Sequence, residues 1–145
     1  MKKMILTLAI AVSTVGAFAR EANVSEKVLN AFNTEFKAAT NVEWTIATDY
    51  YMASFQYNEK YINAFYSTEG ELLGLSRNLS PADLPLNLQT SLKKEYADYW
   101  ISDLLEVAKS EGTSYYITLE DADSKIVLKA SGGNGWTNYK KVKKA

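Results

Sequence analysis

Apolar residues recur every fourth position near the start of the chain and then give way to strict alternation. The recurring positions predict a helix that starts after Ser25, a suitable N-cap, and ends near Lys37. Its apolar stripe consists of Val24, Val28, Phe32 and Phe36. Residues 42–46 then alternate between apolar and polar side chains, which is the pattern of a half-buried strand.

The stretch 50–76 is dense in aromatic residues and is broken at 58–60 and at 68–70. These breaks predict two successive hairpins made of three strands. The first turn can hold two or three residues, and this choice decides which side chains face the helix. A slip of one residue exchanges Tyr61 and Phe65 with Ile62, Ala64 and Tyr66.

A similar pattern follows in the second half of the chain. A second helix is predicted to begin at Leu84-Pro85, because proline suits a first helical turn, and to end near Tyr99. Strands are predicted over 100–108, 113–119, 125–130 and 136–142, and residues 143–145 are expected to fray.

The two halves match in order, which predicts a tandem repeat. Val28, Phe32 and Phe36 align with Leu88, Leu92 and Tyr96 at an offset of 60, whereas Tyr50-Tyr51 and Gly70 align with Tyr115-Tyr116 and Gly135 at 65. Repeat one spans about 24–79 and repeat two about 84–142. The predicted class is α+β: each repeat holds a helix and about four antiparallel strands, and together they form one curved sheet with the helices on one face. The predicted core contains Leu29, Phe32, Phe36, Trp44, Ala53, Phe55, Phe65, Leu92, Ile117 and Leu128.

The N-terminus has the pattern of a secretory signal peptide. Lys2 and Lys3 precede an apolar run from Ile5 to Val15, and Ala17-Phe18-Ala19 provides small residues for cleavage. We expect residues 1–19 to be removed and the domain to be 20–145, exported to the periplasm or the medium. The run is too short to span a bilayer, and a lipid anchor at the cleavage point would need a cysteine, which the chain lacks.

Composition excludes several classes of function. The mature chain would carry a net charge of −3, which argues against general nucleic-acid binding. The chain has no histidine and no cysteine, so it lacks the commonest general base, the thiol nucleophile and the usual transition-metal ligands. We therefore expect no enzymatic activity and no cofactor.

Three further motifs favour structural roles. Glu120, Asp121 and Asp123 could form a weak calcium site, but the glycine and distal glutamate of an EF-hand are missing, so a solvated turn is favoured. The glycines of 132–135 lack the Lys-Ser/Thr of a phosphate loop and predict a tight turn. The lysines of 140–144 could contact a membrane or an acidic partner, but they are typical of an edge strand protected against aggregation.

These features together resemble the PepSY-like, β-lactamase-inhibitor-like (BLIP-like) domains of exported Bacteroidetes proteins. The resemblance covers nearly all of the mature chain, beginning with the signal peptide, the helix and the Trp44-x-Ile46 strand. Its further motifs are Asn63-Ala64-Phe65-Tyr66, Glu69-Gly70-Glu71-Leu72, Leu84-Pro85, Tyr115-Tyr116 and Leu128-Lys129. It implies tandem α-β repeats with a concave sheet. The fold takes its name from a secreted inhibitor whose sheet clamps an enzyme, but that inhibitor's disulfides have no counterpart here, so inhibition of a β-lactamase does not carry over. The restraint of a peptidase, which is linked to PepSY domains, carries over only as a hypothesis.

The surplus of tyrosines is the one candidate for a binding site. Ten tyrosines exceed what so small a core can hold, so some should line the open sheet face, where they could contact a protein or peptide partner or only pair across strands. The candidates are Tyr50, Tyr57, Tyr61, Tyr66 and Tyr116. The leading hypothesis is thus an exported, non-catalytic binding module. The alternative is a small-molecule or glycan-binding periplasmic protein that stacks its ligand on Trp44, Trp100 or Trp136.

Overall fold

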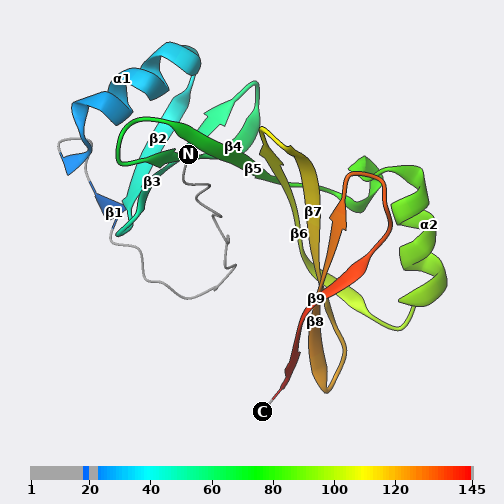
Figure 1. Ribbon diagram of the computed structural model, residues 1–145. Coiled ribbons are helices and arrows are strands. Elements are labelled where there is room, and N and C mark those ends of the chain that lie inside the picture. The colour runs from blue at the N-terminus through cyan, green and yellow to red at the C-terminus, as the bar shows by residue number, and fades with distance from the viewer. Residues whose placement is uncertain (1–17, 20–22, 145) are drawn as a thin grey trace. The chain divides into compact units, whose positions relative to one another are not determined.

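The computed structural model describes residues 18–19 and 23–144, which form two compact units that divide between Leu73 and Gly74. Each unit combines antiparallel strands with one α-helix, as Figure 1 shows. The predicted α+β class is therefore confirmed. Residues 1–17, which carry most of the predicted signal peptide, lie outside the described residues.

The first unit contains helix α1 and a meander of strands. The elements are β1 (Phe18–Ala19), α1 (Glu26–Glu35), β2 (Thr40–Ile46), β3 (Tyr50–Tyr57) and β4 (Lys60–Ser67). Ser25 caps α1 as predicted, because its side chain accepts a hydrogen bond from the Val28 backbone N–H at 3.4 Å. Strands β1 to β4 pair with their sequence neighbours in antiparallel order.

The turn between β3 and β4 settles the register that the sequence left open. It has two residues, Asn58 and Glu59, and both have positive φ angles of 49° and 63°. This backbone matches the twist of a two-residue hairpin. Ile62, Ala64 and Tyr66 consequently share a face with Ala53 and Phe55, because Ala53 pairs with Ala64 and Phe55 with Ile62.

Aromatic rings form the core of the first unit. Phe32 of α1 lies 5.0 Å from Phe55, 5.2 Å from Trp44 and 6.4 Å from Tyr66, measured between ring centroids. All four rings are buried, and their tilted or edge-to-face geometry is favourable. The face of the sheet that carries Trp44, Phe55 and Tyr66 is therefore the face that packs against α1.

Phe65 is buried as predicted but lies on the other face, and Val42 departs from the alternation expected of residues 42–46. Phe65 is buried at 8% exposure, but it points to the face opposite α1, beside Tyr50. Val42 was expected to face inward with Trp44, yet it is 37% exposed because the β2–β3 register shifts between Thr40 and Glu43.

The second unit has five strands and an aliphatic core. Its elements are β5 (Leu72–Asn78), which starts just before the boundary, the 3₁₀ turn η2 (Pro81–Asp83), α2 (Leu86–Glu95), β6 (Trp100–Lys109), β7 (Gly112–Glu120), β8 (Ser124–Ser131) and β9 (Thr137–Lys143). The core cluster consists of Leu84, Leu88, Leu92, Leu104, Ile117, Leu119, Ile126, Leu128 and Ala130. Trp136, predicted to start the last strand, instead precedes it and packs against this cluster.

The strand pairing gives a second way to align the two halves. Trp44 pairs with Ala53 and Leu104 pairs with Ile117, so placing Trp44 on Leu104 puts Ala53 on Ile117 at an offset of 64. With the two pairs placed on each other, Tyr51 aligns with Tyr115, one residue away from the match that the sequence suggested, and the repeat itself stays a prediction. Both units carry a one-residue bulge in this strand pair, between Thr40 and Glu43 in the first and between Ile101 and Asp103 in the second.

Candidate functional site

Two of the five candidate tyrosines face the helix rather than the opposite side of the sheet. Tyr66 is fully buried, with its ring 6.4 Å from Phe32 and 6.5 Å from Trp44. Tyr57 packs its ring 5.8 Å from Phe36 of the α1 C-cap. The prediction that Tyr57 and Tyr66 line an open sheet face is therefore wrong, because the two-residue turn at Asn58 fixes the other parity.

Tyr50 and Tyr61 lie on the face opposite α1. Tyr50 lies diagonally across from Phe65, and their ring centroids are 5.7 Å apart. Tyr61 is 74% exposed and pairs with Gln56 near the end of the hairpin. These two tyrosines have the orientation that the sequence predicted for a contact surface.

Tyr116 belongs to a small cluster on the face opposite α2. It lies across from Lys129 of β8, whose ammonium is 5.6 Å from the centre of the Tyr116 ring. The ring of Tyr139, from β9, meets Tyr116 edge-on at 5.3 Å. We call Tyr116, Lys129 and Tyr139 the tyrosine cluster. The sequence did not single out Tyr139, because the register shift between Val127 and Leu128 decides its side.

A half-open cavity of about 440 Å³ borders the tyrosine cluster. Tyr116 and Lys129 are among the residues that line it, and Lys109, Glu111 and Ser131 line it as well, together with further residues of β6, β7 and the turn after β8. The hollow thus carries charges of both signs beside the half-buried ring of Tyr116.

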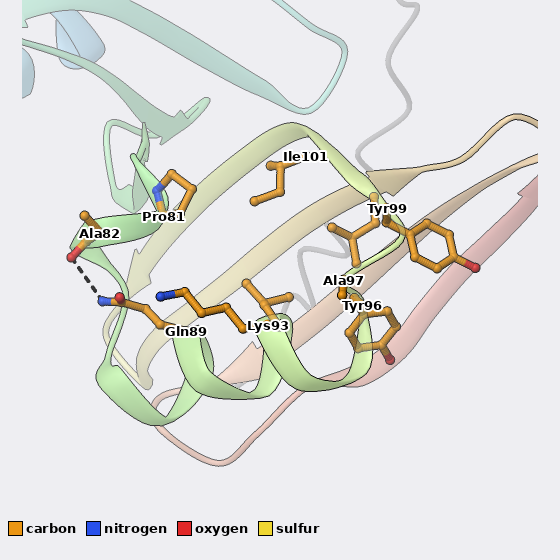
Figure 2. A pocket seen from close by; sticks show the side chains of 10 residues that line it. Pro81, Ala82, Gln89, Lys93, Tyr96, Ala97, Tyr99 and Ile101 are labelled. Atoms are coloured by element: carbon orange, nitrogen blue, oxygen red, sulfur yellow. Dashed lines mark hydrogen bonds between the residues drawn. The ribbon is translucent and has the colours of Figure 1, made fainter.

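A second cavity, of about 390 Å³, lies beside the last turns of α2 and is shown in Figure 2. Its floor includes the buried side chains of Leu92 and Leu119, and Ile101 of β6 forms another side. Burial raises the pKa of Tyr96, which also lines the cavity, above its ordinary value. Lys93 is the one charged residue among the residues that line it.

The turn η2 closes one side of this second cavity, and Gln89 holds it there. The Gln89 side-chain amide donates to the carbonyl of Ala82 at 3.1 Å, as Figure 2 shows, and to that of Leu84 at 2.7 Å. Ser80 and Asp83 complete a capping box around η2. No sequence periodicity indicates such a cavity, because it depends on how the turn η2 folds back on α2.

In the acidic turn between β7 and β8, the Asp121 carboxylate is hydrogen-bonded by groups of the same turn. Asp121 Oδ1 accepts hydrogen bonds from the backbone N–H groups of Asp123 at 2.8 Å and Ser124 at 2.6 Å, and from the Ser124 hydroxyl at 3.0 Å. The backbone bonds hold the pKa of Asp121 below its ordinary value. Within residues 18–19 and 23–144, no group of three or more carboxylates is arranged to hold a metal ion.

The C-terminal end is fixed at Lys144, in contrast to the predicted fraying. The Lys144 ammonium lies 3.3 Å from Glu120 Oε1, donates to the Asp121 carbonyl at 2.7 Å, and sits 4.7 Å from the centre of the Trp100 ring. The pKa of Glu120 is lowered, first by a hydrogen bond from Ser102 and then by Lys144. Part of the predicted basic tail therefore has a structural role.

The three tryptophans do not flank either cavity. Trp44 is buried, and Trp136 donates its indole N–H to the Leu88 carbonyl at 3.1 Å. Trp100 is 53% exposed but carries Lys144 on its ring. The structure thus offers no cavity lined by tryptophan among the two described, and stacking of a ligand on Trp44, Trp100 or Trp136 stays a prediction.

No family model matches the chain, and no curated protein matches it either. Several solved structures, however, are similar to it. A BLIP-like protein of Bacteroides fragilis superposes with a TM-score of 0.73 at 22% identity, covering 83% of this chain and 88% of that one. A protein of Bacteroides eggerthii described as periplasmic gives 0.74 at 14%, covering 83% and 88%. A DUF2874 family protein of Bacteroides ovatus gives 0.72 at 19%, covering 81% and 86%.

None of these descriptions names an enzymatic activity, and none names a binding partner. The likeness extends over most of each chain and concerns the fold. It agrees with the arrangement of helices and antiparallel strands described above and with the resemblance seen in the sequence. The chain has the BLIP-like fold.

Proposed function

We propose that this protein is an exported, non-catalytic binding module that contacts a protein or peptide with the tyrosine cluster of its second unit. The observation that carries the proposal is the pairing of Tyr116 and Tyr139 with Lys129 beside a cavity of about 440 Å³. Tyrosine offers rigid amphipathic contact area at a small cost in conformational entropy, and a lysine beside it adds polar selectivity.

The two units are in our proposal tandem copies of one structural repeat. Residues 23–40 and 83–100 have the same class of burial position for position, although their sequences differ. Gly70 and Gly135 close equivalent turns with φ angles of +85° and +84°. The same frame thus carries an aromatic core in one copy and an aliphatic core in the other.

Export is supported by the charged and apolar pattern of residues 1–19 and by a structural neighbour described as periplasmic. No helix within the described residues is long and apolar enough to cross a membrane. We place the mature protein in the periplasm or the medium.

The proposal is tested by affinity capture from the envelope and medium of the producing bacterium, followed by a binding assay with the purified partner. Tyr116→Ala should weaken binding about tenfold or more, since aromatic residues at an interface centre commonly contribute over 1 kcal/mol. Leu86→Ala is the matched control, because Leu86 is 78% exposed on α2 and away from the cluster. Equal binding by wild type and Tyr116→Ala would refute the assigned surface.

The cavity beside α2 favours a second candidate, the binding of a small amphiphilic anion. Leu92, Leu119 and Ile101 would hold an apolar body, and Lys93 would face its charge. Anilinonaphthalene sulfonate is a suitable probe of this chemistry. Lys93→Ala should reduce its binding several-fold, whereas Lys94→Ala, one residue further along α2 and outside the cavity lining, should not. Equal losses in both variants would contradict a site at this cavity.

A further inference from the structure

The short strand β1 pairs with β2 in a register that recurs in the second unit. Phe18 pairs with Thr45 and Ala19 with Trp44. Sixty residues later, Asn78 pairs with Leu105, and the backbone N–H of Leu79 donates to the carbonyl of Leu104 at 3.0 Å. Each of these four residues of the first unit has its counterpart 60 positions later. Strand β1 therefore has the same place beside β2 that the end of β5 has beside β6.

The segments that follow the two strands keep this offset as well. The burial classes of residues 23–40 and 83–100 agree at every position, and the helices α1 and α2 begin at Glu26 and Leu86. A strand that leads into the helix is thus part of the unit as it folds. The backbone of β1 belongs to the domain on this argument, although the sequence pattern assigns Phe18 and Ala19 to the signal peptide.

The N-terminal sequence offers two positions for cleavage of a signal peptide. Ala17-Phe18-Ala19 allows a cut after Ala19, and Val15-Gly16-Ala17 allows a cut after Ala17, because both place small or compact residues at the last and third-last positions. We propose that the signal peptidase cuts after Ala17, so that Phe18 is the first mature residue and β1 stays on the protein. This inference rests on the proposed export.

Retention of β1 has a physical advantage for the first unit. Strand β1 covers β2 at Trp44 and Thr45, whose outer backbone groups would otherwise form an open sheet edge. An open edge is a template for pairing with other chains, and its polar backbone groups need partners. A cut after Ala19 would expose this edge and leave the unit without the strand that its counterpart keeps.

Intact-mass measurement of the protein, expressed from its full sequence and purified separately from the exported and the cytoplasmic fraction, tests the inference. A chain that begins at Phe18 supports it. A chain that begins at Arg20 overturns the inference but leaves export intact. A chain that keeps Met1 and stays in the cytoplasm overturns both the inference and the proposed export.

Two substitutions in the precursor separate the cleavage positions. Val15→Asp places a charge at the third-last position of the proposed cut and should block or shift it. Ala19→Asp changes the last residue before the alternative cut only, and should leave the proposed cut unchanged. Blocked processing in Ala19→Asp together with normal processing in Val15→Asp would overturn the assignment.

Two leaderless chains that start at Phe18 and at Arg20 provide an independent measurement. The chain that starts at Phe18 should show slower hydrogen exchange at the amides of β2 and a Tm higher by roughly 5 °C, as expected for a modest gain in a small domain. Equal exchange and equal Tm in the two chains would show that β1 does not contribute to the fold and would count against its retention.

Discussion

Replacing Tyr66 with phenylalanine removes a hydroxyl that the structure leaves without a partner. Tyr66 is fully buried between Phe32 and Trp44, and its oxygen makes no hydrogen bond to any described residue. Such groups are rare in folded proteins, because a buried donor and acceptor that loses water without replacement raises the free energy of the folded state. The substitution Tyr66→Phe should therefore stabilise the protein.

The size of the effect follows from two opposing contributions. The unsatisfied hydroxyl costs about 1–3 kcal/mol. Its removal leaves a void of roughly 10 Å³, which at about 24 cal/mol per Å³ costs only ~0.2 kcal/mol. The aromatic contacts with Phe32 and Trp44 are kept. We expect Tyr66→Phe to raise the free energy of unfolding by about 1–2 kcal/mol, which corresponds to an increase in Tm of roughly 4–8 °C.

The same substitution should change the alkaline limb of the stability curve. Burial, and to a lesser degree the charge of Glu35, raises the pKa of Tyr66 above its ordinary value of about 10. A group with a raised folded pKa contributes stability that is present below its unfolded pKa and is lost as the pH rises above it. Wild type should thus lose up to ~1.4 kcal/mol for each pH unit above about 10 from this residue. Tyr66→Phe lacks this loss, so its advantage should widen.

Urea unfolding at pH 7 and at alkaline pH measures both effects, with linear extrapolation to water. Tyr61→Phe is the matched control, because Tyr61 is 74% exposed and its hydroxyl is in water, and it should change stability by less than about 0.5 kcal/mol. A Tyr66→Phe variant less stable than wild type would refute the reasoning, since it would mean that the buried hydroxyl has a partner such as an ordered water.

Two further outcomes follow from single turns. Gly70→Ala should lower the free energy of unfolding by about 2–4 kcal/mol, measured with urea, because φ is +85° and an added Cβ would lie 2.9 Å from the Lys27 carbonyl oxygen. Gly135→Ala should lower it by only about 1 kcal/mol, because its φ of +84° is similar but the space around it is open. Equal costs would contradict the role of the close contact. Asp121→Asn should lower Tm at pH 7, and the difference in Tm from wild type should be smaller at pH 3. The pKa of Asp121 is depressed in the folded protein, so its charge contributes stability above about pH 4 that is lost as the pH falls through the pKa of the folded state. A Tm difference that is constant across this range would contradict a charged Asp121 as the acceptor.

The sequence predicted the elements well because each depends on local patterns. The stripe around Phe32, the N-cap Ser25 and the breaks after Tyr57 and Ser67 all act within a few residues, and the elements of the first unit lie where these patterns place them. The second helix is shorter than predicted, because α2 ends at Glu95 and not near Tyr99. The register of the β3–β4 hairpin was less accessible. Asn58 favours a positive φ but Glu59 does not, so the two-residue turn carried a weak signal and the faces of Tyr61 and Tyr66 stayed undecided.

The candidate site depended on contacts that no local pattern reports. The tyrosine cluster forms because a register shift on β9 brings Tyr139 to Tyr116, and the C-terminal end is ordered because Lys144 reaches Glu120 and Trp100. Each contact joins residues that are distant in sequence. The tyrosine count indicated a contact surface, but only the pairing register could separate Tyr50, Tyr61 and Tyr116 from the tyrosines that face α1.

The proposed repeat offers a reason why a cavity lies beside α2. In the proposed repeat, Phe32 aligns with Leu92 at the offset of 60 shared by the burial pattern, and Phe55 aligns with Leu119 at the offset of 64 from the strand pairing. Two aromatic rings that touch at 5.0 Å in the first unit are thus two leucines in the second, and both leucines line the cavity of about 390 Å³. A smaller side chain in the same frame leaves the space that the larger one fills.

Leu92→Phe restores the aromatic residue of the first unit and should therefore fill the cavity. We expect this variant to lose the binding of anilinonaphthalene sulfonate several-fold while its Tm stays within a few degrees of wild type, because the added ring enters existing space. Leu88→Phe is the contrasting change. Leu88 is fully buried and does not line the cavity, so the added volume should cost about 1–3 kcal/mol. If the two variants lose similar amounts of stability, the space beside Leu92 cannot accept a ring. If Leu92→Phe is as stable as wild type and still binds the probe, the probe binds elsewhere.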